Sequence, residues 1–183
     1  MTNLHTLGPK ATDSFRAAQY LIHHHDKFKD EAIVLHDSFE TIYQHLKSYS
    51  GDYFLVPTAY QSRTNHESWA SNNYYFWQDL SIVDTFFLPT YPMLLVENQD
   101  INNHHAVLHA ATNELMNQFE STLDAPLERS YVTSKPLAKT AFAEGKFQYA
   151  IFSKPATPLS FEFHDRILQE YHIDMVWCVY EIN

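Results

Sequence analysis

The sequence has one cysteine, three glycines and few cations. The single cysteine, Cys178, excludes a disulfide framework within the chain, and its place in the strand-like run "DMVWCVYEI" indicates a small, buried side chain. Twelve Lys and Arg side chains stand against 22 Asp and Glu, so the formal net charge is −10 and a nucleic-acid partner is not expected. No apolar run is long enough to span a membrane, and the N-terminus lacks a basic segment followed by an apolar run. We therefore expect a cytoplasmic protein with no membrane partner.

The sequence also lacks the motifs of several catalytic classes. It contains no glycine-rich phosphate loop, no GxSxG elbow and no paired CxxC. Histidine is abundant, with 12 residues, but the consecutive residues 23–25 point to different faces of a helix end. His105 and His109 have the spacing of a helical metal pair, yet they flank a predicted strand. Neither a metal site nor a cofactor is expected.

The residues that are present predict an alternating α/β chain. Hydrophobic residues make up 45% of 183 residues, which is enough for a packed core. Strands are expected at residues 4–7, 33–35 (buried), 53–57, 106–108, near 130, 147–153 and 172–183. Helices are expected at 12–20, after Asp37 or Ser38, up to about 119, and before Gly145. The polar stretch 61–73 predicts a loop. The prolines at 89 and 92 indicate a boundary between two lobes.

Three loops share a chemical character, because each follows a strand and opens a helix with hydroxyls or amides. They cover residues 8–14, 109–113 and 133–136. A helix N-terminus carries about half a positive charge and unpaired N–H groups, so it can bind a carboxylate without a cationic side chain. Ordinary helix capping is the alternative for each loop. In an α/β arrangement of mainly parallel strands, ligands bind beyond the carboxyl ends of the strands.

Several segments resemble the catalytic domain of prephenate dehydratases. "TLGPKATDSFRAA" is similar to that family's "TLGP-x-G-T-x-S" opening, "LHDSFETIYQHL…DYFLVP" to its second and third strands, and "VTSKPLA…AEGKFQYAIFS" to its later "S-T-x-A-A" region. Within the family, "VPTAY", His109 and "MVWCVY" are most similar to the bacilysin-pathway prephenate decarboxylases. The resemblance implies a two-lobed fold like that of type 2 periplasmic binding proteins, with an interlobe cleft. The prolines and the last strand place lobe 1 at 1–88 plus about 158–183 and lobe 2 at 89–157, and the resemblance implies no regulatory ACT domain.

Two departures from the family bear on the expected chemistry. The dehydratases end their domain with Thr-Arg-Phe, whose threonine assists departure of the ring hydroxyl, and the aligned residues here are Met175, Val176 and Trp177. Without that acid, the resemblance implies decarboxylation of prephenate, or a closely related dicarboxylate, with the hydroxyl retained. Ala11 stands where the family usually has glycine in the first loop.

The site expected from the resemblance combines residues of both lobes. His109 or Tyr60 is expected to deliver the proton as a catalytic residue. The expected substrate-binding residues are Thr6, Gly8, Thr12, Ser14, Thr58, Thr112 and Ser134. Lys10, Arg63 and Lys135 are candidate charge partners.

Two other functions are open at this stage, and so is the assembly. One is a non-catalytic small-anion receptor or sensor on the same fold, and the other is a prephenate dehydratase that uses another acid. The aromatic residues of "YYFW" and "TFFLPTYP" would suit a subunit interface, so a homodimer is expected.

Overall fold

The fold consists of two compact α/β units. It is described from a computed structural model of the chain, which covers residues 2–62, 67–154 and 165–183. The first unit comprises Met1–Thr90 with Asp174–Asn183, and the second comprises Tyr91–Ile173.

The first unit contains a five-stranded sheet with the order β2-β1-β3-β10-β4. Its elements in chain order are β1 (Asn3–Leu7), α1 (Asp13–His24), the 3-10 helix η1 (Asp26–Phe28), β2 (Ala32–His36), α2 (Phe39–Gln44), the 3-10 helix η2 (Leu46–Tyr49), β3 (Tyr53–Pro57), α3 (Trp69–Tyr75), β4 (Leu80–Phe87) and β10 (Val176–Ile182). Strands β2, β1 and β3 are parallel, whereas β10 is antiparallel to both β3 and β4.

The second unit repeats this plan with the order β7-β6-β8-β5-β9. Its elements are β5 (Met93–Asn98), β6 (His105–His109), the 3-10 helix η3 (Ala110–Thr112), α4 (Asn113–Glu120), β7 (Glu128–Val132), α5 (Lys135–Phe142), β8 (Tyr149–Ser153) and β9 (Asp165–Tyr171). Strands β7, β6 and β8 are parallel, and β5 is antiparallel to β8 and β9. By position in the two sheets, β2 corresponds to β7, and α2 corresponds to α5.

The α/β class is confirmed, but each sheet is mixed. Two of the four neighbouring strand pairs in each sheet are antiparallel, because β10 and β5 each enter a sheet against the direction of the parallel strands. The expected return of the chain to the first lobe at about residue 158 also differs from the structure. The return occurs at Asp174, because β9 pairs with β5 in the second sheet.

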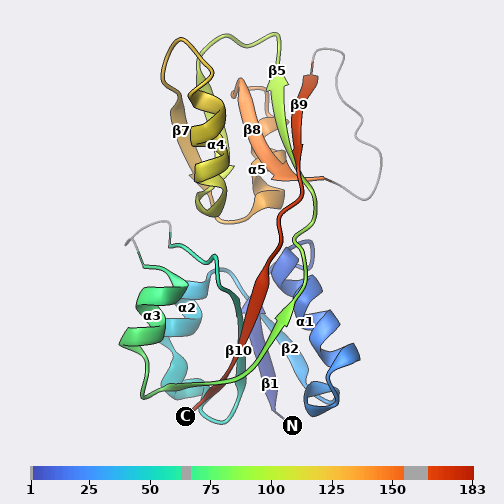
Figure 1. Cartoon of the computed structure of the whole chain (residues 1–183), viewed down its shortest axis with the longest axis vertical. Helices are drawn as coiled ribbons and strands as arrows, with labels where there is room; N and C mark the ends of the chain where they lie inside the picture. The colour runs from blue at the N-terminus through green and yellow to red at the C-terminus, as the bar shows by residue number, and fades with distance from the viewer. Residues whose placement is uncertain (1, 63–66, 155–164) are drawn as a thin grey trace. The chain divides into compact units, whose positions relative to one another are not determined.

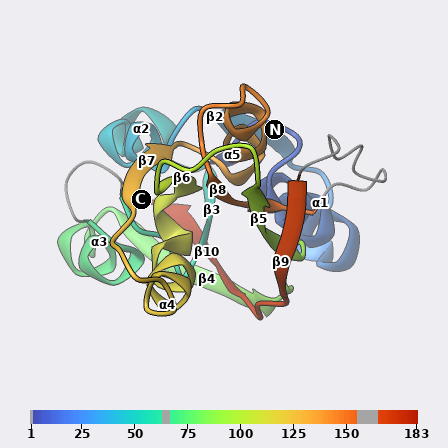
Figure 2. The same ribbon diagram turned by 90° about the horizontal axis from the view of Figure 1, so that it is seen from above.

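Alternating side chains of the central strands fill two apolar layers in each unit. In β3, Phe54 and Val56 pack toward α2, whereas Leu55 packs with Leu21 of α1. Figure 1 accordingly shows α1 on one face of the first sheet and α2 and α3 on the other. Figure 2 shows α4 and α5 on opposite faces of the second sheet, where they cover separate apolar layers.

Helix caps and close backbone contacts explain how the strands turn into helices. Thr12 caps α1 by accepting a hydrogen bond from the Phe15 N–H at 3.2 Å, as its place in the sequence predicts. A side chain at Gly8 would bring a Cβ to 3.1 Å from the Cβ of Leu35, which is a tight contact, so glycine suits the close approach of the chain to β2 here. Gly145, with φ of +70°, follows α5 in the left-handed conformation that favours glycine.

Two local predictions from the sequence are wrong. The stretch 61–73 is not all loop, because Ser68 and Ser71 form a capping box that starts α3 at Trp69. The strand at 33–35 is not buried, because β2 lies at the edge of its sheet and its residues are half-buried or exposed.

Candidate anion-binding site

Parallel strands bring the helix-opening loops together within each unit. In the second unit, His109 at the end of β6 lies opposite Val132 at the end of β7, so the loops 109–113 and 133–136 begin side by side. In the first unit, the Gly8 N–H donates to the His36 carbonyl oxygen at 2.8 Å, which holds the loop 8–14 beside the end of β2. Each unit therefore presents one group of predicted site residues at the carboxyl ends of its parallel strands.

Most predicted site hydroxyls of the first unit are engaged in hydrogen bonds to the backbone. Thr6 is fully buried and donates to the Leu55 carbonyl oxygen at 2.9 Å. Thr12 lies within 3.0 Å of the carbonyl oxygens of Leu7 and Pro9 in addition to capping α1. Thr58 donates to the Val176 carbonyl oxygen at 3.2 Å. These three hydroxyls therefore hold the loops in shape, as expected of ordinary caps and turns.

Tyr60 lies in the apolar core of the first unit and is only 6% exposed. Its ring packs edge-on against Phe39 at a centroid distance of 5.1 Å. Burial, with the Glu40 carboxylate nearby, raises the pKa of Tyr60 above its ordinary value, so the phenol stays protonated. A buried phenol with a raised pKa is poorly suited to cycle as a proton donor.

The helix starts of the first unit already carry carboxylates, which are not among the predicted site residues. Asp13 is the first residue of α1 and is 8% exposed, and Glu40 lies in the first turn of α2. In the second unit, Glu114 occupies the first turn of α4. A carboxylate in the first turn stabilises the positive end of the helix dipole and so competes with an external anion. Acidic residues directly after a cap were the signal in the sequence.

Helix α5 is the exception among these four helices. Its first turn has no acidic residue and begins with Lys135. The N-cap Ser134 is 4% exposed, and its Oγ is buried without a hydrogen-bond partner in the part of the chain that the structure describes. Its counterpart at the start of α2, Ser38, accepts a hydrogen bond from the Thr41 N–H at 3.1 Å. A buried hydroxyl without a partner is costly, so this one is available to an anion at the start of α5.

His109 and Thr112 form the neighbouring part of the site. The Nδ1 of His109 accepts a hydrogen bond from the Ala111 N–H at 3.2 Å, so the neutral ring carries its proton on Nε2. Thr112 is 3% exposed and donates to the His109 carbonyl oxygen at 2.8 Å, which fixes the turn. The predicted residues His109, Thr112 and Ser134 are thus grouped at adjacent strand ends.

The remaining predicted residues contribute less. Ser14 is buried in the first turn of α1, beside Asp13. Lys10 is exposed, and its Nζ lies 6.0 Å from the centroid of the Phe15 ring. Arg63 lies outside the described residues.

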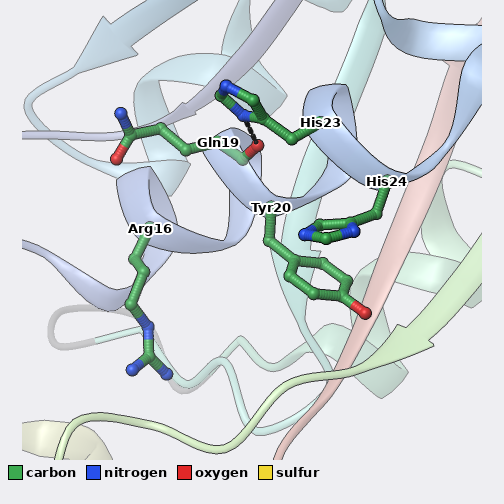
Figure 3. A pocket seen from close by; sticks show the side chains of 5 residues that line it. All are labelled: Arg16, Gln19, Tyr20, His23 and His24. Carbon is green, nitrogen blue, oxygen red and sulfur yellow. Dashed lines mark hydrogen bonds between the residues drawn. The ribbon is translucent and has the colours of Figure 1, made fainter.

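A surface hollow along α1 does not provide a competing site. It is lined by Arg16, Gln19, Tyr20, His23 and His24. Figure 3 shows Arg16 and His23 pointing in different directions, while the His24 ring lies beside Tyr20 at a centroid distance of 4.4 Å. Because these polar groups do not converge, the hollow offers no defined contact set for a ligand.

Other features of the described chain bear on the chemistry. Cys178 is fully buried in β10, and burial raises the pKa of its thiol, which leaves it a poor nucleophile. No group of three or more His, Cys, Asp or Glu side chains in residues 2–62, 67–154 and 165–183 is arranged to hold a metal ion. None of the helices in those ranges is long and apolar enough to cross a membrane.

Comparisons with known proteins show which fold this is. No protein-family model and no curated protein matches the chain. In structure it is similar to a prephenate dehydratase from Arthrobacter aurescens in complex with L-Phe, with 13% sequence identity and a TM-score of 0.56 over 100% of this chain and 60% of that chain. It is also similar to the periplasmic VFT2 domain of BvgS from Bordetella pertussis (13% identity, TM-score 0.59, 99% of this chain and 80% of that chain). A third similar structure is an ABC transporter from Parabacteroides distasonis (13% identity, TM-score 0.58, 97% of this chain and 65% of that chain).

At these identities the likeness concerns the fold alone, and the chain spans less than two thirds of the length of the dehydratase. The chain therefore has the α/β fold that periplasmic-binding-protein-like domains share with prephenate dehydratases.

Proposed function

We propose that the chain binds a small organic dicarboxylate, and that one carboxylate binds at the start of α5. The observation that carries this proposal is the buried Ser134 hydroxyl without a partner, at a helix start with no acidic residue in its first turn. A carboxylate oxygen placed there would accept the Ser134 hydroxyl proton and would interact favourably with the helix dipole.

For the chemistry, we propose decarboxylation of prephenate, or a closely related dicarboxylate, with the ring hydroxyl retained. His109 is the proposed residue that orients the proton delivered to the ring, because its Nδ1 accepts the Ala111 N–H and its Nε2–H is then the group that can contact the substrate or a water molecule. Tyr60, the other candidate, is buried in the core. Loss of carbon dioxide is favoured when the carboxylate lies in a water-poor environment, because its localised charge is then destabilised relative to the transition state.

The residues in place of the dehydratase Thr-Arg-Phe motif support retention of the hydroxyl. Trp177 is 1% exposed, and its Nε1 donates to the Leu88 carbonyl oxygen at 2.9 Å. Val176 and Met175 carry no acidic group. None of the three could protonate a departing hydroxyl, so a dehydratase is the least favoured of the three functional hypotheses.

A non-catalytic anion receptor is the second candidate. The observation that favours it is that the first unit's threonine hydroxyls are engaged in hydrogen bonds to the backbone rather than presented to a ligand. A receptor needs the Ser134 contact but no proton donor.

The test is to incubate the purified protein with prephenate, follow the ultraviolet absorbance and identify the products by mass spectrometry. Carbon dioxide release with a retained hydroxyl is expected, and it should be lost in His109→Gln but not in His105→Gln. His105 is the matched control, because it lies on the same strand and its Nε2 is hydrogen-bonded to the Ser130 hydroxyl instead. Formation of phenylpyruvate would contradict the decarboxylase, binding without turnover would support the receptor, and absence of binding would overturn both.

A further inference from the structure

A chain of hydrogen bonds links three titratable side chains on one side of the first sheet. The Nε2 of His5 in β1 lies 2.9 Å from an Asp52 carboxylate oxygen, and its Nδ1 lies 2.8 Å from the Nε2 of His36 at the end of β2. His5 is 3% exposed, and its ring stacks on Tyr49 of η2 at a centroid distance of 4.2 Å. These groups connect β1, β2, η2 and the residue before β3.

The Asp52 carboxylate fixes the positions of the protons. Burial raises its pKa, but hydrogen bonds from Asn3 and His5 outweigh burial and hold the pKa below its usual value. Asp52 therefore stays ionised and accepts a hydrogen bond from the Nε2–H of His5, which leaves Nδ1 of a neutral His5 as an acceptor. The Nε2–H of His36 must then donate a hydrogen bond to Nδ1 of His5, which leaves Nδ1 of His36 as the nitrogen that can bind a further proton.

The histidine pair can hold one extra proton but not two. With one proton, His36 is an imidazolium that still donates to His5. A second proton would have to bind Nδ1 of His5, and two N–H groups would then face each other across 2.8 Å. Double protonation is therefore incompatible with the observed contact.

We propose that Asp52, His5 and His36 form an acid-sensitive latch, which releases the end of β2 from β1 when the two imidazoles take up protons. β2 is an edge strand, so its end can separate without disturbing the central strands. The His36 carbonyl oxygen also accepts the Gly8 N–H, so release of the latch would free the loop that leads into α1.

The groups around His36 determine whether acidification favours the closed or the released latch. The groups that face it are His5 from β1, His45 from the end of α2, Tyr49 from η2 and the adjacent Asp37. Burial and the His5 and His45 imidazoles lower the pKa of His36, and Asp37 opposes them. Because the released histidine binds protons more tightly than the latched one, acidification below the ordinary histidine pKa favours release.

Hydrogen exchange measured by NMR tests the latch on the whole chain. From about pH 7.5 to about pH 5.5, protection of the β2 amides, corrected for intrinsic exchange, should fall by up to ten-fold per pH unit for each proton taken up. His36→Gln should remove this dependence, since its amide can donate to His5 but does not titrate. His23→Gln is the control, because His23 is exposed on α1 and its Nδ1 contacts the Gln19 carbonyl oxygen of the same helix. The latch is wrong if His36→Gln keeps the pH dependence of the parent chain.

Side-chain ¹⁵N NMR spectra of the parent chain provide a second measurement, which does not require a substituted chain to fold. At about pH 7.5, His5 should carry its proton on Nε2 and His36 should carry its proton on Nε2. A His5 ring protonated on Nδ1 would refute the proton arrangement on which the latch rests.

Discussion

Replacing Ser134 and Ser38 by alanine, one at a time, should have different effects on stability and on ligand binding. The two serines occupy corresponding N-cap positions, at the starts of α5 and α2. The Ser38 hydroxyl caps its helix by accepting the Thr41 N–H at 3.1 Å, and it also contacts the Thr41 hydroxyl at 3.0 Å. The Ser134 hydroxyl makes no such cap and is buried without a partner among the described residues.

The structure gives the expected magnitudes. Loss of the Ser38 cap should lower the free energy of unfolding by about 1 kcal/mol. A buried hydroxyl without a partner costs about 1–3 kcal/mol, so Ser134→Ala should leave stability unchanged or raise it. In thermal unfolding followed by circular dichroism, Ser38→Ala should lower the Tm by about 2–4 °C, whereas Ser134→Ala should not lower it.

Ligand binding should show the opposite pattern. A hydrogen bond to a carboxylate contributes about 1.5–3 kcal/mol, so Ser134→Ala should weaken binding of prephenate in calorimetry by about ten-fold or more. Ser38→Ala should leave the affinity unchanged, because Glu40 already occupies the first turn of its helix. The reasoning is refuted if Ser134→Ala destabilises the protein as Ser38→Ala does and leaves the affinity intact.

Three further substitutions test the roles of first-unit residues. Thr12→Ala removes the cap of α1 and the hydroxyl's contacts with two carbonyl oxygens, so urea unfolding should show a loss of about 1–2 kcal/mol. Gly8→Ala places a Cβ 3.1 Å from that of Leu35, so urea unfolding should show a loss of about 1–3 kcal/mol in the free energy of unfolding. Tyr60→Phe removes a buried hydroxyl in the core, so both the urea midpoint and any prephenate turnover should be retained, and loss of turnover alone would restore Tyr60 as a proton donor.

Much of the fold could be predicted from the sequence, because local patterns determine it. Hydroxyl residues at 12 and 38 lie just before apolar residues at helical spacing, and both cap helices in the structure. The helix α3 was missed because it has seven residues, only Asn72 of which is buried, so it leaves no apolar period in the sequence. The antiparallel neighbours of β10 and β5 were missed because strand direction within a sheet depends on tertiary packing rather than on local sequence.

The candidate site could be predicted only in part, because local sequence patterns determine the positions of its loops but not the contacts of its side chains. Strand–loop–helix patterns located His109, Thr112 and Ser134, but they could not show that the Thr6 hydroxyl donates to the Leu55 carbonyl oxygen. The link between His5 and His36 depends on the register of β1 and β2, in which His5 lies opposite Val34 and reaches along the strand. Such contacts between distant parts of the chain leave no periodic signal in a single sequence.

The position of β10 between β3 and β4 has a consequence for the order of folding during translation. Every strand of the second sheet is synthesised before residues 176–182, so the first sheet cannot receive its inner antiparallel strand until the whole second unit has been made. Until then β3 lacks a partner on one side, β4 lacks its strand partner, and the apolar layer that contains Phe86 lacks Trp177 and Val179. The interval before β10 joins the sheet is therefore when the open edge of β3 can pair with a strand of another chain.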